Sequence, residues 1–218
     1  LRGGYLGVDL FFVLSGFLIT SLLVAEQGST GRVDLRAFWI RRARRLFPAV
    51  LAIMPAVALY AAFLAKPAEL ARIRGDGIAT LAYVANWRSI FAGKSYWDLF
   101  TAPSPLEHTW SLAIEEQFYV VWPLVAFFVL RRSRGSARPL LVLSAVLAVA
   151  SALAMWFLFT PDSTSRAYLG TDTRGAAILV GAAFACVLAG KKPLAGVVAG
   201  RALDVAGLVA LVGLGYAW

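Results

Sequence analysis

The chain has 218 residues, of which 60% are hydrophobic and 15% charged, and its mean hydropathy is +0.74. Soluble domains are usually about half apolar and about a quarter charged, so this composition indicates a membrane protein. The formal net charge is +9, but the basic residues form short clusters between apolar runs, which argues against nucleic acid as a partner.

The cysteine and histidine content excludes two kinds of site. Cys186 is the only cysteine, so no internal disulfide can form, and its apolar surroundings in sequence predict a buried thiol. His108 is the only histidine. A site built from several cysteine and histidine ligands is therefore excluded, and we expect no metal and no bound cofactor.

Apolar runs long enough to cross a bilayer recur along the chain. At 1.5 Å per residue, about 20 apolar residues cross the hydrocarbon core. The predicted all-α fold is a polytopic transmembrane helix bundle, with spans at residues 5–25, 49–64, 110–130, 139–159 and 175–190. The chain opens on LRGG and ends within a sixth apolar run, LVALVGLGYAW. We therefore expect a fragment of a longer membrane protein, truncated at both ends.

The distribution of lysine and arginine predicts the orientation of these spans. The clusters at 32–45, 131–138 and 191–201 are typical of cytoplasmic loops, whereas the loops at 66–108 and 161–173 have mixed charge and should be external. This orientation is consistent only if the moderately apolar segment 77–93 does not fully cross the membrane. We therefore predict that this segment is re-entrant or packed against the bundle, where polar groups are tolerated.

The segment HTWSLAIEEQFY (108–119) opens the predicted span 110–130 with two adjacent acids. Consecutive helical residues lie about 100° apart, so Glu115 and Glu116 face different directions. Glu115 shares a face with Ser111, Tyr119 and Trp122. One interpretation is a polar helix start with both glutamates solvated. The other is that at least one glutamate faces a polar cavity, because ionisable groups inside spans usually mark a functional path.

Two further sets of charged residues stand out. RRARR (41–45) suits phosphate groups, and its arginines either anchor the chain at anionic lipid or bind a phosphorylated cytoplasmic donor such as a coenzyme A thioester. Asp9 lies in the first predicted span and needs a partner there. Asp172 and Arg174 form a candidate local pair at the start of the last complete span. Gly4, Gly7 and Gly16 would allow a neighbouring helix to approach closely.

Three stretches together resemble a known family. GGYLGVDLFFVLSGFLIT, FWIRRARRLFPAV and HTWSLAIEEQFYVVWPL occur in this order in the acyltransferase 3 family, and YLGTDTRGAAILVGAAFA is also similar. These integral-membrane enzymes O-acylate lipopolysaccharide, peptidoglycan, other exported glycans and some macrolide-type products. The resemblance covers nearly all of the chain, which would form one acyltransferase 3 transmembrane domain over residues 1–218 of a bundle of roughly ten spans.

The resemblance implies a multi-pass protein of the bacterial cytoplasmic membrane that moves an acyl group, expected to be acetyl, from acyl-CoA to a glycan or glycosylated acceptor. The family's RxxR pair matches Arg42 with Arg45, and equally Arg41 with Arg44. Its essential histidine lies upstream of the GVD motif and thus before Leu1, so we expect the chain alone to be inactive. His108 sits in a different motif.

The predicted site residues follow from these motifs. Glu115, and less favourably Glu116, would line an acceptor cavity open to the external side, with His108 and Trp110 at its rim. The candidate catalytic residues are Glu115, Glu116 and His108; the candidate acyl-CoA-binding residues are Arg41, Arg42, Arg44 and Arg45; the candidate acceptor-cavity residues are Asp9, Ser111, Tyr119 and Trp110.

Two other functions remain open at this point. In a proton-coupled membrane transporter, Asp9 and Glu115 would relay protons, although no inverted repeat or pair of broken helices is visible. In a structural scaffold, Glu115 and Arg45 would tolerate alanine. Tyr96 and Trp97 in SYWDLF suggest sugar stacking at the external rim.

Overall fold

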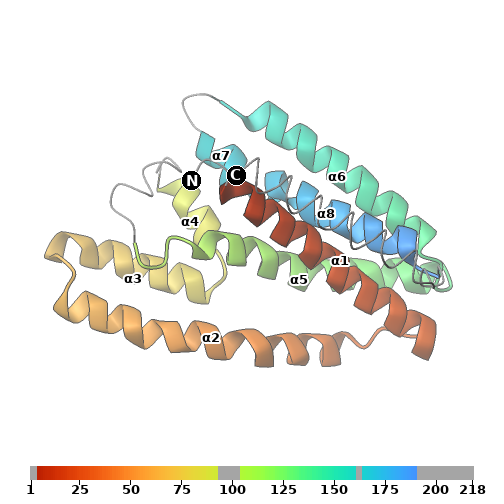
Figure 1. Cartoon of the computed structure of the whole chain (residues 1–218), viewed down its shortest axis with the longest axis horizontal. Coiled ribbons are helices and arrows are strands. Elements are labelled where there is room, and N and C mark those ends of the chain that lie inside the picture. The colour runs from red at the N-terminus through yellow and green to blue at the C-terminus, as the bar shows by residue number, and fades with distance from the viewer. Residues whose placement is uncertain (1–3, 93–103, 161–163, 191–218) are drawn as a thin grey trace, which may run out of the picture.

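The computed structural model describes residues 4–92, 104–160 and 164–190, which form helices joined by short connections (Figure 1). Within these ranges no strand is present. The helices are α1 (Gly4–Thr30), α2 (Leu35–Phe63), α3 (Pro67–Leu81), α4 (Ala85–Phe91), α5 (Thr109–Arg132), α6 (Arg138–Leu158), α7 (Thr164–Leu169) and α8 (Thr171–Leu188).

Within the described ranges, five helical stretches are long and apolar enough to cross a membrane. They cover Leu6–Thr30, Leu35–Phe63, Thr109–Arg132, Arg138–Leu158 and Thr164–Leu188, the last combining α7 and α8. This confirms the predicted polytopic helix bundle and the multi-pass membrane location. The predicted sixth span lies outside the described residues.

The second span differs from the prediction, which separated a basic interfacial segment from a span beginning at residue 49. The structure has one continuous helix from Leu35, and Pro48 and Pro55 lie inside it. Asp34 starts α2 by accepting a hydrogen bond from the Ala37 N–H at 2.9 Å. Proline is tolerated inside membrane helices because neighbouring groups and local adjustments satisfy the freed carbonyls. The basic segment and the apolar span therefore belong to one helix.

The α1–α2 and α5–α6 turns lie at the same end of the bundle (Figure 1). Arg32 is in the first turn and the other arginines of its cluster follow on α2. The predicted orientation requires these turns to share one end, and the side of the membrane that this end faces stays a prediction. Helices α3 and α4 lie toward the other end. They have 15 and 7 residues, and an ion pair of 2.8 Å between Asp76 and Arg88 joins them. The described part of segment 77–93 therefore packs against the bundle, as predicted.

Glycines bring α1 and α8 into backbone contact. A Cβ at Gly16 would collide with the carbonyl of Ile178, and a Cβ at Gly181 would collide with the carbonyl of Val13. Gly16 thus has the predicted packing role, whereas Gly7 faces open space.

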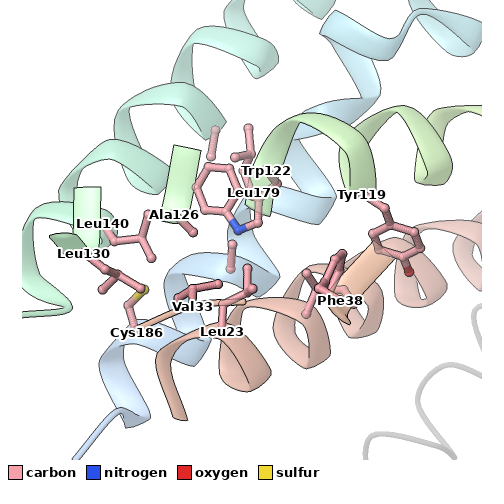
Figure 2. Close-up of a cluster of buried hydrophobic side chains, with 13 residues drawn as sticks. Leu23, Val33, Phe38, Tyr119, Trp122, Ala126, Leu130, Leu140, Leu179 and Cys186 are labelled. Carbon is pink, nitrogen blue, oxygen red and sulfur yellow. The ribbon is translucent and has the colours of Figure 1, made fainter. Parts of the chain in front are cut away.

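The main apolar core lies between α1, α5, α6 and α8 and continues to the start of α2 (Figure 2). Trp122 is buried there, and its Nε1–H donates to the Thr20 hydroxyl at 2.9 Å. Cys186 is buried in the same cluster, as its apolar surroundings predicted.

Candidate active site

Glu115 is enclosed by hydroxyl groups at the centre of the bundle. It is 5% exposed. The Ser15 hydroxyl on α1 and the Tyr119 hydroxyl on α5 both donate to Glu115 Oε1 and also contact each other. The pairing of Glu115 with Tyr119 confirms that they share a helix face. Because this carboxylate already has two protein donors, Glu115 belongs to a closed cluster.

Arg42 of α2 lies against the same cluster. Its guanidinium carbon is 3.6 Å from the centroid of the Tyr119 ring, a cation–π contact. Trp39, one turn earlier, donates its Nε1–H to the Tyr119 carbonyl at 3.0 Å. Tyr119 lies about 20 Å along α5 from its end at Arg132. Arg42 therefore contacts α5 near its middle, well away from its end at Arg132.

Glu116 faces a different space, which we call the Glu116 pocket. It has a volume of about 640 Å³. Glu116 Oε1 and Arg42 Nε are both buried and have no hydrogen-bond partner among the described residues. The pocket is bounded by Trp39, Arg42, Ala43, Leu46 and Phe47 of α2, by Ala82, Tyr83 and Val84 of the α3–α4 turn, and by Glu116, Gln117, Tyr119, Val120 and Val121 of α5.

The two unpartnered groups have complementary chemistry. A carboxylate oxygen accepts a hydrogen bond and a guanidinium N–H donates one. Burying either without a partner is costly, so such groups are usually satisfied by water or a ligand. The wall of the pocket therefore includes one residue that accepts hydrogen bonds and one that donates them.

A hydrogen-bonded network fixes the wall of this pocket beside Glu116. Gln117 donates to the Tyr83 carbonyl at 2.8 Å and to Asn86 Oδ1 at 3.0 Å, and accepts from the Thr171 hydroxyl at 2.6 Å. Asn86 is fully buried and also donates to the Leu169 carbonyl at 3.0 Å. The network ties α4, α5 and the α7–α8 junction together, so the α3–α4 turn is held against α5.

Tyr83 closes the pocket from that turn. Its φ is 54°, a left-handed conformation that non-glycine residues seldom adopt. Such backbone strain, about 1–3 kcal/mol, is concentrated at functional sites. Burial, and secondarily the nearby Glu116 carboxylate, raise the pKa of the Tyr83 hydroxyl above its ordinary value. The hydroxyl therefore stays neutral and can donate a hydrogen bond.

Asp9 has the partner that its position in a span requires. This partner is Arg174, which the sequence had paired with Asp172. Arg174 Nη2 of α8 lies 3.0 Å from Asp9 Oδ1, and its guanidinium carbon lies 4.5 Å from the centroid of the Tyr168 ring. Asp172 instead accepts two hydrogen bonds from Arg166, at 2.8 and 2.6 Å. The predicted Asp172–Arg174 pair was wrong, because α8 turns Arg174 toward α1 and leaves Asp172 beside α7.

Three other predicted residues lie away from the Glu116 pocket. Trp110 was expected at a cavity rim, but it is 5% exposed and packs edge-on against Phe12 at a centroid distance of 6.5 Å. His108 is exposed at the N-cap of α5 and makes no side-chain capping bond. The Ser111 hydroxyl donates to the His108 carbonyl at 3.3 Å. Tyr96 and Trp97 lie outside the described residues.

Of the four arginines in RRARR, only Arg42 faces the pocket. Arg41, Arg44 and Arg45 are exposed, and Arg41 makes a loose ion pair of 3.9 Å with Glu26. Ser15, Gln117 and Tyr83 were not predicted as site residues. Gln117 carried a readable signal, since it is a polar side chain beside two acids in an apolar span. The contact of Ser15 depends on how α1 and α5 pack.

The fold is that of a polytopic membrane protein, with a glutamate and an arginine from different helices at the wall of one pocket. The family model described as an acyltransferase domain, acyltransferase 3, matches residues 2–217. The chain belongs to this family, as the three motifs predicted.

Two curated relatives refine the comparison. The chain is 46% identical over 189 residues to the peptidoglycan O-acetyltransferase OatA of Listeria monocytogenes, covering 85% of this chain and 30% of the relative. It is 44% identical over 191 residues to the O-acetyltransferase OatA of Staphylococcus aureus, covering 87% and 30%. The chain thus spans about 30% of the length of these relatives. No solved structure matches it.

Proposed function

We propose that the protein is a membrane-embedded O-acyltransferase that moves an acetyl group from acyl-CoA to a hydroxyl of a cell-envelope glycan, with peptidoglycan as the glycan. The observation that carries this proposal is the pair of buried, unpartnered groups in the Glu116 pocket, Arg42 Nε and Glu116 Oε1. Family membership and the names of the relatives support the reaction class and the acceptor.

In this proposal the two groups divide the reaction between them. Glu116 accepts a hydrogen bond from the acceptor hydroxyl and orients its oxygen, while Arg42 donates to the thioester carbonyl oxygen as negative charge develops there. The hydroxyl oxygen attacks the carbonyl carbon, the carbon–sulfur bond breaks, and the thiolate takes up a proton. The products are an ester and free coenzyme A. The hydroxyl proton passes to a general base, which the family resemblance assigns to a histidine upstream of the GVD motif.

Glu115 has a supporting role in this scheme. Its carboxylate, held by Ser15 and Tyr119, fixes the ring on which Arg42 lies. This reverses the order of the two glutamates expected from sequence, in which Glu115 was the favoured cavity residue. In this scheme Arg42 donates a hydrogen bond to the carbonyl oxygen of the acyl group. It need not contact the phosphates of the donor.

The test uses the full-length protein in nanodiscs with labelled acetyl-CoA and peptidoglycan fragments. We expect acceptor-stimulated release of free CoA and label on the glycan, both lost in Glu116→Gln and Arg42→Gln. Arg44→Gln is the matched control, because this exposed side chain lies in the same basic segment outside the pocket. A proton-coupled transporter would instead move its substrate without CoA release or glycan labelling. If no label reaches the glycan with any of a range of labelled acyl donors, the proposal is refuted.

A further inference from the structure

A second pocket, which we call the basic pocket, lies at the predicted cytoplasmic end of the bundle. It has a volume of about 700 Å³ and lies between the α1–α2 turn and the α5–α6 turn. These turns are about 100 residues apart in sequence and adjacent in the fold (Figure 1). The residues that matter for its chemistry are Arg32, Arg131, Arg134, Gln27, Gly31 and Gly135.

Among the residues that the structure describes, the positive charge of the basic pocket is uncompensated. Three arginines line the pocket, and none of the described carboxylates does. Among the described residues, none of the three forms an ion pair with an acid. The nearby acid Glu26 is engaged elsewhere, since its Oε1 accepts the Asp34 N–H at 3.2 Å and its Oε2 lies 3.9 Å from Arg41.

The walls of the basic pocket are built from fixed backbone rather than loose loop. Gly31 and Gly135 have φ values of 75° and 87°, and both end a helix by donating their N–H groups to carbonyls of the last turn. Gln27 Nε2 donates to the Gly31 carbonyl at 2.9 Å. Arg134 adopts a φ of 53°, which non-glycine residues seldom do. The backbone around the three arginines is thus set by hydrogen bonds and turn geometry.

Membrane topology by itself explains positive charge at this end, but not its convergence on one pocket. Arg132 follows Arg131 directly and is also exposed, yet it lines a different surface beside Phe128 and Pro139. Arg131 also offsets the negative end of α5, whereas Arg32 and Arg134 lie beyond the helices. Three arginines line one hollow, and arginine is the residue that binds phosphate groups through paired N–H donors.

We propose that the basic pocket binds the phosphate group of a cytoplasmic ligand. This inference extends the proposed function, because the donor in that function is a phosphorylated thioester. Arg131 lies about 18 Å from Tyr119 along α5. Coenzyme A separates its phosphates from its sulfur by an extended arm, so phosphates held by Arg131 leave the acyl group free to reach the Glu116 pocket. The same chemistry would also hold the headgroup phosphate of an anionic lipid.

The experiment measures binding without acyl transfer, so its result is independent of whether the transfer reaction occurs. Desulfo-coenzyme A, which has no sulfur to acylate, is titrated against the full-length protein in phosphatidylcholine nanodiscs. We expect Arg131→Gln combined with Arg134→Gln to weaken its affinity by about tenfold or more. Arg132→Gln is the matched control and should leave the affinity unchanged. Size-exclusion profiles and melting temperatures verify that each variant is folded.

A second arm distinguishes the two sources of phosphate. If the lipid headgroup is the ligand, phosphatidylglycerol in the nanodisc will raise the melting temperature of the wild type but not of the double variant, and desulfo-coenzyme A will not bind. Two results would overturn the proposal: no effect of either probe, or an equal loss in Arg132→Gln, which would mean that only the overall charge of this end matters. If desulfo-coenzyme A binds but no acetyl transfer occurs, the proposed function is refuted, whereas the proposed phosphate binding in the basic pocket is supported.

Discussion

The guanidinium carbon of Arg42 lies 3.6 Å from the centroid of the Tyr119 ring, which joins a basic segment expected at the membrane surface to a polar face in the middle of α5. The contact brings Arg42 and Glu116 to one pocket, although the two residues are 74 positions apart in sequence. Several measurable consequences depend on this arrangement.

Arg42→Lys is expected to lower the rate of acetyl transfer about 100-fold, although it keeps the positive charge. Lysine has no planar fork, so it cannot both lie on the Tyr119 ring and present the Nε–H that faces the pocket. The rate is measured with labelled acetyl-CoA in nanodiscs, with Arg44→Lys as the control. Wild-type activity in Arg42→Lys would mean that the charge alone suffices.

Tyr119→Phe and Ser15→Ala are expected to destabilise the fold. Each removes one of the two hydroxyl donors to the buried Glu115 carboxylate, at a cost of about 1–3 kcal/mol. Melting temperatures in detergent should fall for both variants. Glu116→Gln should lose activity without a fall in melting temperature, because Glu116 Oε1 has no partner among the described residues to lose. Equal melting temperatures for all three variants would contradict the inference that the Ser15 and Tyr119 hydroxyls stabilise the fold by binding Glu115.

Gly16→Leu and Gly181→Leu are expected to separate α1 from α8 and prevent correct assembly. In each case the new side chain meets a backbone carbonyl of the facing helix, which cannot rotate away as a side chain would. Gly7→Leu is the control, since Gly7 faces open space. The yield of monodisperse protein in size-exclusion chromatography measures the effect. A similar loss with Gly7→Leu would show that the helix tolerates no leucine at its glycines, irrespective of packing.

Asp9 and Arg174 should be coupled in a double-mutant cycle. The Arg174 side chain is 8% exposed and that of Asp9 is 35% exposed. Arg174→Gln or Asp9→Asn alone strands the other charge, so each single variant should melt at a lower temperature. The double variant should lose less than the sum of the two shifts. Strict additivity would indicate that the pair contributes no interaction energy.

Tyr83 should make stability fall at alkaline pH. Because the pKa of its hydroxyl is raised in the folded state, the folded protein holds this proton more tightly than the unfolded chain does. The contribution is fully present below the unfolded value of about 10 and is lost as the pH rises through the folded value. Tyr83→Phe should therefore flatten the decline in melting temperature above that pH. If the melting temperature of Tyr83→Phe declines as steeply as that of the wild type, other groups cause the decline.

The amphipathic and apolar patterns predicted much of the architecture correctly. The third and fourth predicted spans match α5 and α6 to within about two residues at each end, the usual precision of helix boundaries. The i, i+4 spacing placed Glu115 and Tyr119 on one face, and they are hydrogen-bonded there. Such predictions succeed because they depend on local helix geometry and on the length of the hydrocarbon core.

Apart from the start of the second helix, the errors concern contacts between helices. Asp172 was paired with its neighbour Arg174, but the rotation of α8 gives it Arg166 instead and gives Arg174 to Asp9. Trp110 was expected at the rim of the acceptor cavity, yet Phe12 of α1 and the Tyr168 ring pack against it. Sequence spacing does not state which neighbouring helix a residue will meet.

The sequence alone determined that this protein is a multi-pass helix bundle of the acyltransferase 3 family, because apolar run length and long ordered motifs are properties of the chain itself. Only the tertiary structure decided which glutamate faces a pocket. Glu115 and Glu116 differ by about 100° around one helix. That rotation directs one toward the Ser15 hydroxyl of α1 and the other toward the guanidinium of Arg42 on α2, and helix packing alone sets these directions.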